Sequence, residues 1–293
     1  MKRMEIWFIL ALSVAFFWGV SQVFAKYSTP RLGVARVALL IALVEGSMYT
    51  IAFLVWREDV EITLADGILA AGSCIIGISG YLCFFESIID GQVAIAGTIS
   101  AAYPALTVVG AITLLSESLT AVQAFGVIII IGGVVALSYE PDPTAKHAIS
   151  KRSLTFAFLA FAAWGLWSLT SKMAIDEVGA GNMFGFYIIS SLTAPLTYAW
   201  VRRVRPPTNV AQNPTRLAWI YGVIALAFNV GGAYAYTYAL DKGTASLVVT
   251  TSSAYPIVTV VLAVALLKEK IHWTQVIWLI GVLAGLLLIG LNA

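Results

Sequence analysis

One acidic residue, Glu45, lies in the middle of an apolar stretch of this 293-residue chain, about twelve residues into a run with no other acid. A carboxylate in the hydrocarbon core costs several kcal/mol, so such a residue by default faces a wet cavity and has a function. Because burial in a low dielectric favours the neutral form of a carboxyl group, we interpret Glu45 as a proton-coupling residue. The alternative is a permanently neutral carboxyl that is hydrogen-bonded to Ser47, Ser190 or Ser191.

Five further residues could bind an organic solute. Trp18 and Trp164 lie near the middle of apolar runs beside a glycine, and Tyr81 and Tyr234 also lie next to or near glycines. Aromatic rings of this kind suit an amphipathic solute, although most aromatic residues of membrane proteins are interface anchors or packing. Arg36 precedes Glu45 by nine residues, roughly 13 Å along a helix, and could hold an anionic group. We expect all five to be substrate-binding residues.

Pro104 and Pro256 lie inside apolar runs. A proline within a helix frees the carbonyl four residues earlier, here at Ser100 or Ser252, and that carbonyl needs another partner in lipid. We interpret both prolines as hinges in bending helices. The alternative is a fixed kink that serves packing.

These residues belong to a sequence that is duplicated. Residues 99–117 (ISAAYPALTVVGAITLLSE) and 251–269 (TSSAYPIVTVVLAVALLKE) are identical at eleven of nineteen positions, at an offset of 152. Trp18-Gly19 recurs as Trp164-Gly165 at an offset of 146. An internal repeat of this length must be recognised before a fold is assigned.

Composition places both repeats in a bilayer. The chain is 60% apolar and 11% charged, and uncharged stretches of about 20 residues recur from end to end. Continuous apolar runs of this length exclude transmembrane strands. We therefore predict an all-α integral membrane protein of ten transmembrane helices, at residues 6–27, 34–56, 66–88, 92–114, 120–138, 153–174, 182–201, 217–240, 244–267 and 272–292.

Each half holds five predicted helices, so the two repeats, residues 5–139 and 153–292, must enter the membrane with opposite orientation. Inverted repeats of this kind are typical of secondary transporters, whose substrate site lies near the bilayer midplane. Connections after odd-numbered helices carry most of the Lys and Arg residues, which places both termini outside the cell.

The short motifs of the chain resemble those of EamA-like members of the drug/metabolite transporter superfamily. The motifs are Trp18-Gly19, Arg36, Tyr103-Pro104 and Leu115-Ser116-Glu117, with Trp164-Gly165, Tyr255-Pro256 and Leu267-Lys268-Glu269 in the second half. The resemblance implies export of amino acids or other metabolites. It also implies cytoplasmic termini, contrary to the Lys and Arg distribution, so both orientations stay open.

Other chemistry is excluded by absent motifs. The sequence has no Walker loop, HExxH, Gly-x-Ser-x-Gly or Rossmann glycine run, and Cys74 and Cys83 are spaced for neither zinc nor a disulfide. We expect no enzyme activity, no cofactor and no metal. With a net charge of +2 carried by the connections, nucleic-acid binding is excluded as well. The expected partners are a small-molecule solute, the lipid bilayer and protons.

The sequence thus predicts a secondary transporter in the cell membrane, plasma or inner, as a monomer or a homodimer. It would export a small, amino-acid-like organic metabolite by alternating access between the repeats. A non-transporting scaffold or a lipid-modifying enzyme on the same fold is the alternative.

Overall fold

The computed structural model describes residues 5–89, 93–138, 150–204, 214–267 and 273–292. These described ranges are helical and contain no strand, so the predicted all-α class is confirmed. The first half holds α1 (Ile6–Leu32), α2 (Val34–Leu40), the π-helical turn η1 (Ile41–Glu45), α3 (Gly46–Trp56), α4 (Leu64–Ile89), α5 (Val93–Ala101), α6 (Tyr103–Leu114) and α7 (Ala121–Ser138). The second half holds α8 (Lys151–Val178), α9 (Ala180–Val204), α10 (Arg216–Lys242), α11 (Ala245–Ser252), α12 (Tyr255–Leu267) and α13 (Trp273–Gly290).

Eight helical segments of the described chain are long and apolar enough to cross a bilayer. Three of these segments, at Ala35–Trp56, Gly97–Leu114 and Ala245–Leu262, are each made of two or more consecutive helical elements. A further apolar helix, at Ala121–Leu137, is shorter than the eight. The chain is therefore an integral multi-pass membrane protein. The count of ten spans stays a prediction, since α9 is not among the eight.

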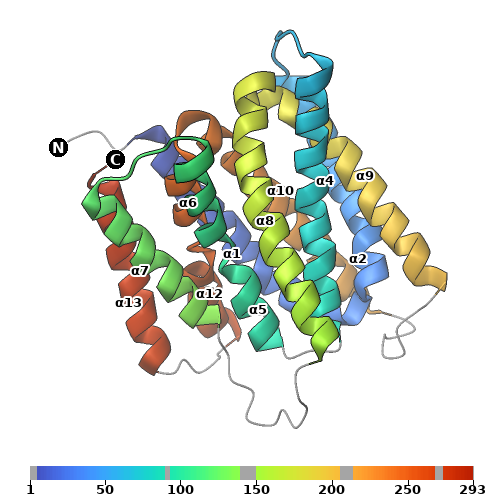
Figure 1. The fold of residues 1–293 in the computed structure, drawn as a ribbon. Helices are drawn as coiled ribbons and strands as arrows, with labels where there is room; N and C mark the ends of the chain where they lie inside the picture. Colours follow the sequence, from blue (N-terminus) through green and yellow to red (C-terminus); the bar gives the residue numbers. More distant parts are fainter. Residues whose placement is uncertain (1–4, 90–92, 139–149, 205–213, 268–272, 293) are drawn as a thin grey trace.

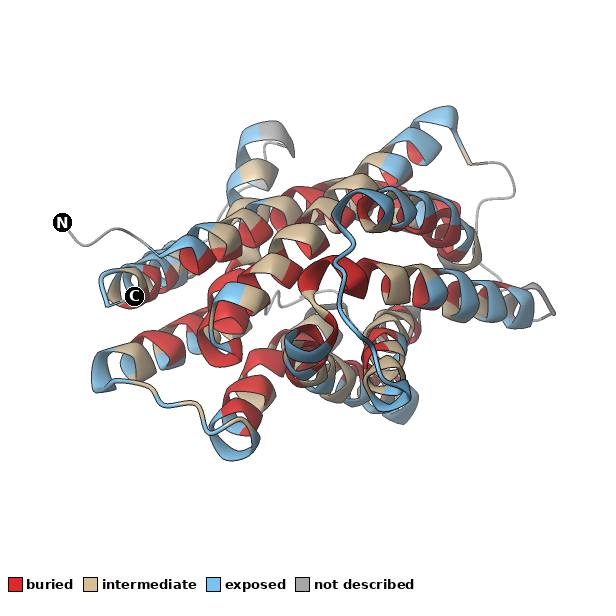
Figure 2. Cartoon of the chain, turned by 90° about the horizontal axis from the view of Figure 1, so that it is seen from above, coloured by how far each residue is buried: buried red, intermediate tan, exposed pale blue. Residues whose placement is uncertain are grey.

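Large apolar side chains cover the outside of the bundle. Leu64, Trp200 and Leu287 are 82%, 69% and 65% exposed, and the exposed faces of the helices point outward in the view of Figure 2. In water such a surface would be an aggregation hazard, but hydrocarbon tails solvate it. The buried faces point inward, toward neighbouring helices.

Helices of the two halves pair with each other. The helix pairs that pack against each other across the two halves are α1 with α10, α4 with α8, α3 with α9, α6 with α11 and α7 with α13. Exchanging the halves converts the α1–α10 pair into the α4–α8 pair, so the arrangement has the symmetry of the duplication. Figure 1 shows α4 and α8 side by side.

Two equivalent contacts show this symmetry at atomic detail. Thr107 Oγ1 donates to Gly165 O and Thr259 Oγ1 donates to Gly19 O, both at 3.2 Å. Each threonine also donates within its own helix. A Cβ at Gly165 would lie 2.7 Å from Leu106 Cδ2, so the absence of a side chain permits the close approach.

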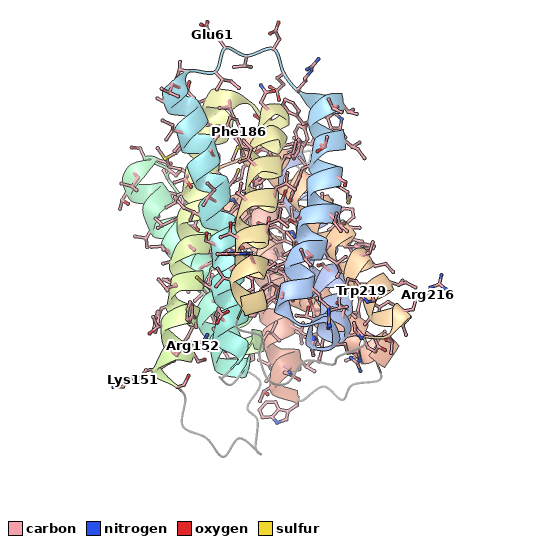
Figure 3. The ribbon with its side chains drawn as sticks, turned by 90° about the vertical axis from the view of Figure 1, so that its right-hand side faces the viewer. Glu61, Lys151, Arg152, Phe186, Arg216 and Trp219 are labelled. Carbon is pink, nitrogen blue, oxygen red and sulfur yellow. The ribbon has the colours of Figure 1, made fainter. Side chains whose placement is uncertain are left out.

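Polar contacts between the halves occur toward both ends of the bundle. Near the α3–α4 connection, Glu58 Oε1 accepts from Gly181 N (2.8 Å), and Asn182 exchanges two hydrogen bonds with the Glu58 backbone. Figure 3 shows that this connection, marked by Glu61, lies at the end opposite Arg152. Glu117 similarly holds the start of α11, accepting from Ala245 N (2.7 Å) and Ser246 N (3.0 Å). A carboxylate at a helix N-terminus satisfies amides that have no partner within the helix.

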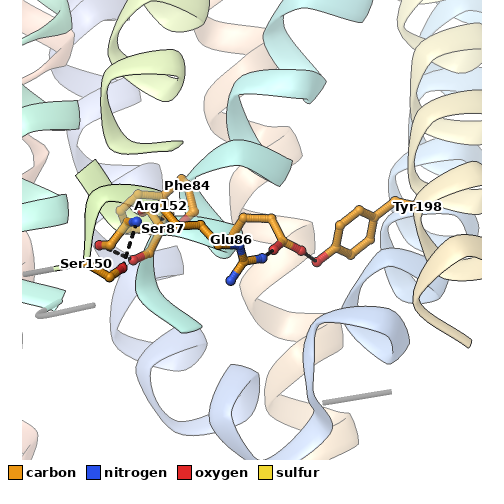
Figure 4. Close-up of polar contacts among 7 residues, drawn as sticks. Phe84, Glu86, Ser87, Ser150, Arg152 and Tyr198 are labelled. Atoms are coloured by element: carbon orange, nitrogen blue, oxygen red, sulfur yellow. Dashed lines mark hydrogen bonds and ion pairs between the residues drawn. The ribbon is translucent and has the colours of Figure 1, made fainter. Parts of the chain in front are cut away.

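At the opposite end, Glu86 joins three helices. Its carboxylate accepts from Arg152 Nη2 and from Tyr198 Oη (2.6 Å), and so connects α4 with α8 and α9 (Figure 4). Beside it, Ser153 Oγ donates to Ser87 O at 2.7 Å. The two halves are thus tied together by charged or polar groups at both ends.

Candidate functional site

A cavity of about 130 Å³ lies between the α1–α10 pair and the α4–α8 pair. Its lining is rich in aromatic residues and comes from both halves: Trp18, Gln22, Ile41, Glu45, Tyr49, Cys74, Gly77, Ile78, Tyr81, Tyr103, Trp164, Trp167, Tyr187, Ser190, Ser191, Asn229, Ala233 and Tyr255. An apolar cavity with a few convergent polar groups is the usual form of a small-molecule site.

The structure brings four of the sequence-predicted residues together around this cavity. They are Trp18 from α1, Glu45 from η1, Tyr81 from α4 and Trp164 from α8. Trp18 Nε1 donates to Asn229 O at 3.2 Å, which ties its indole to α10. What each of these residues does for a solute remains a prediction.

Glu45 is 5% exposed, and its Oε1 accepts a hydrogen bond from Asn229 Nδ2 at 2.9 Å. It is the last residue of the π-helical turn. Such a turn inserts an extra residue into a helix and is frequent at functional sites. The turn changes the direction of the side chains that follow it relative to an uninterrupted α-helix.

The proposed serine partners of Glu45 need a correction. Ser190 and Ser191 do line the cavity, but they donate to Tyr187 O and Ile188 O on their own helix, both at 3.1 Å. Ser47 donates to Leu43 O at 2.6 Å. Hydroxyls in helices commonly bond the preceding turn in this way, so Asn229 of α10 is the partner instead.

Two aromatic corners of the cavity are related by the duplication. Trp18 meets Tyr255 edge-on with ring centroids 6.4 Å apart, and Trp164 meets Tyr103 edge-on at 6.0 Å. Between them, the buried Tyr236 ring lies 5.3 Å from Trp18 and 5.0 Å from Trp167. The cavity therefore has rigid aromatic walls on both sides.

Arg36 does not reach the cavity. It lies near the start of α2, where Nη1 donates to Leu32 O at 3.2 Å, and it is not among the described lining residues. The reason is distance, because nine residues separate it from Glu45 along nearly continuous helix. The predicted contact between Arg36 and a solute therefore stays a prediction, for a residue outside the described lining.

Tyr234 is also absent from the described lining. It follows the lining residue Ala233, and one residue turns a helix by about 100°, which directs Tyr234 elsewhere. Its hydroxyl donates to Met48 O at 2.6 Å, and its ring packs edge-on against Trp56 (5.4 Å) and Phe184 (5.1 Å). Tyr234 thus belongs to an aromatic cluster between the cavity and the end of α3.

The prolines differ from the predicted kinks in continuous helices. The helices are interrupted, since α5 ends at Ala101 and α6 begins at Tyr103, whereas α11 ends at Ser252 and α12 begins at Tyr255. Pro104 therefore lies in the first turn of α6, where its missing amide costs no helical hydrogen bond. Neither Pro104 nor Pro256 is among the described lining residues, but the tyrosine before each one is.

Several lining residues were missed in the sequence. Asn229 and Gln22 are polar residues inside apolar spans, and Gln22 follows Trp18 by one helical turn, so a search for such residues would have found both. Trp167 and Tyr187 give no such signal. Trp167 Nε1 is nevertheless buried without a hydrogen-bond partner. Buried polar atoms of this kind are available to a ligand or to water.

The described residues contain no group of three or more His, Cys, Asp or Glu side chains that could hold a metal ion. Cys74, although it lines the cavity, is a free cysteine. The chemical character of the site comes from one carboxyl group, two amides, hydroxyls and aromatic rings.

Comparisons with known proteins agree with this architecture. A family described as the EamA-like transporter family matches residues 5–139 and again residues 151–291. An uncharacterized protein of Methanocaldococcus jannaschii, MJ1333.1, is 29% identical over 139 residues, which is 46% of this chain and 98% of that protein. A solved structure titled "Crystal structure of protein" superposes with a TM-score of 0.77 at 18% identity, covering 99% of this chain and 100% of its own. That structure is evidence for the fold alone.

If the cavity is reached by water, Trp18→Cys and Trp164→Cys should react with a water-soluble methanethiosulfonate reagent in a Cys74→Ala, Cys83→Ala background. Ile130→Cys is the matched control, because Ile130 is fully buried on α7 against α13. Labelling is read by mass spectrometry of the protein in membranes. Two cavity cysteines as unreactive as the control, with and without substrate, would mean that the cavity is not a water-accessible site.

Proposed function

The chain belongs to the EamA-like transporter family, and we propose that it is a secondary transporter that exports a small organic, amino-acid-like metabolite. The observation that carries this proposal is the cavity between the α1–α10 and α4–α8 pairs, with a carboxyl group among aromatic walls. In duplicated transporters the substrate site lies at the interface of the repeats, near the middle of the membrane.

The packing suggests which parts move. Because each long helix pair combines one helix from each half, neither repeat forms a body of its own. The α1–α10 pair and the α4–α8 pair separate on one side of the cavity and close on the other. This refines the sequence-based expectation of movement between the two repeats.

Each end of the cavity has contacts that would have to open. Toward the α3–α4 connection, Tyr49 stacks on Tyr187 at 5.1 Å, and behind them Phe184, Tyr234 and Trp56 pack together. Toward the other end, Tyr198 of α9 donates to Glu86 of α4, whereas the bond from Arg152 to Glu86 stays within the α4–α8 pair (Figure 4). Breaking one set while the other stays closed is alternating access.

Proton coupling is the proposed source of energy for uphill export. Glu45 is the one carboxyl group in the described lining, and it is buried. Closure around it favours the neutral form, while opening to water on one side permits release of the proton there. One proton would enter for each cycle in which solute leaves.

The Glu45→Gln variant tests both transport and coupling. Glutamine resembles the protonated carboxyl, so in liposomes the variant should still exchange labelled solute at saturating concentration but lose accumulation driven by a pH gradient. Glu177→Gln, an exposed site at the end of α8, is the matched control. Wild-type accumulation by Glu45→Gln would contradict coupling through this residue. No solute flux by wild-type protein, across a panel of amines, amino acids and other metabolites, would favour a scaffold or a lipid-modifying enzyme.

We propose that the interruptions before Pro104 and Pro256 are hinges. Replacing either proline by alanine supplies an amide that can bond the carbonyl four residues earlier, at Ser100 or Ser252, and so join the two helices across the interruption. The protein should therefore fold while the interruption stiffens. Pro104→Ala and Pro256→Ala should therefore slow exchange severalfold at unchanged expression and thermal stability. Pro195→Ala, at a proline inside α9, is the control. Unchanged exchange rates in both hinge variants would assign these prolines to packing.

A further inference from the structure

The charge balance of the cavity points to a particular class of solute. The described lining contains one carboxyl group, Glu45, and no Lys, Arg or His side chain. An anionic group that entered would lose its hydration and find no positive partner, which disfavours its binding. A positive group would find a carboxylate that is already desolvated.

The carboxyl group has room for a second partner. Among the described residues Asn229 is its hydrogen-bond donor, and that bond goes to Oε1. The second oxygen, Oε2, does not belong to the set of fully buried polar atoms without a partner. Because the Glu45 side chain forms part of the cavity wall, a solute in the cavity can reach this oxygen. An ammonium group, which has only donors, complements an oxygen in this position.

The walls favour the same class. Trp18 with Tyr255 and Trp164 with Tyr103 form the two aromatic corners on either side of the cavity. Faces of tryptophan and tyrosine attract organic cations, and cages of such rings bind ammonium groups in many proteins. Aromatic walls also bind the apolar part of an amine. The same rings can therefore contact both the ammonium group and the apolar part of the solute.

A second polar group belongs to the cavity wall. Trp167 Nε1 can only donate a hydrogen bond, and it is buried without a partner. It is neutral, and therefore matches a neutral acceptor such as a hydroxyl, ether or carbonyl oxygen better than a carboxylate. A buried anion would need a positive charge beside it.

We propose that the solute of this cavity is a small organic amine of net positive charge, whose ammonium group binds Glu45 between the aromatic corners. This proposal deepens the transporter function and rests on it only for the movement of the amine. It narrows the expected amino-acid-like metabolite to its decarboxylated, cationic relatives. Binding itself can be measured without transport.

The test compares four probes that share a phenyl ring: 2-phenylethylamine, 2-phenylethanol, L-phenylalanine and 3-phenylpropionate. Binding to the full-length purified protein is followed by quenching of tryptophan fluorescence, to which Trp18, Trp164 and Trp167 contribute from the cavity wall. A charge-assisted hydrogen bond predicts that the amine binds about tenfold or more tightly than each of the other three. Glu45→Gln should abolish that preference, whereas Glu177→Gln should retain it.

A wild-type measurement guards against a misfolded variant. The amine should slow modification of Glu45 by dicyclohexylcarbodiimide, read by mass spectrometry, while 3-phenylpropionate should not. The proposal is overturned if L-phenylalanine or 3-phenylpropionate binds as tightly as the amine, if Glu45→Gln keeps the preference, or if the amine leaves the modification rate unchanged. Exchange of L-phenylalanine in liposomes without any amine preference would overturn the cationic class but leave the transporter function standing. Amine binding without exchange of any probe would leave the cationic class standing but overturn the transporter function.

Discussion

The structure depends on one constraint: neither half of the chain buries its own inner surface. Each long helix of one half packs along a helix of the other, and the contacts of Thr107 and Thr259 with the facing glycine carbonyls repeat that arrangement on both sides. In a bilayer the hydrophobic effect does not drive helices together, so close packing at glycine and interhelical hydrogen bonds must do so. The cavity is the space that these two symmetric pairs leave between them, and its walls therefore come from both halves.

Within that space, the burial of Glu45 is the least symmetric feature. A carboxyl group in low dielectric needs a partner, and the amide of Asn229 supplies one from the facing half. The π-helical turn that ends at Glu45 has no described counterpart in α9, so the duplicated scaffold has diverged at this point. Symmetric walls with an asymmetric charge can bind a solute in one orientation, which a transporter needs if it is to discriminate among similar molecules.

The fold class, the duplication and part of the cavity lining could be predicted from the sequence, because the patterns that indicate them extend over many residues. Apolar runs of helix length and the repeated Tyr-Pro segments indicated the all-α class and the duplication, and Trp18, Glu45, Tyr81 and Trp164 lie around one cavity as their depth in the spans suggested. The contacts that were not predicted are those that depend on rotation about a helix axis. Depth along a span does not say that Tyr234 faces Met48 or that Asn229 faces Glu45, because those contacts depend on pairing between distant helices. The helix interruptions at the prolines were expected as kinks, since a sequence shows the missing amide but not whether the helix continues.

The α1–α10 and α4–α8 pairs are proposed to open the cavity on alternate sides. Electron–electron double resonance between spin labels on the two ends of α8 and α10 tests it most directly. One pair replaces Lys151 and Arg216, which are exposed at the start of each helix (Figure 3), and the other replaces the exposed Glu177 and Lys242 near their ends. With a transported solute added to the protein in liposomes, the account predicts that one distance lengthens while the other shortens. Two distance distributions that stay unchanged, or that shift in the same direction, would contradict it.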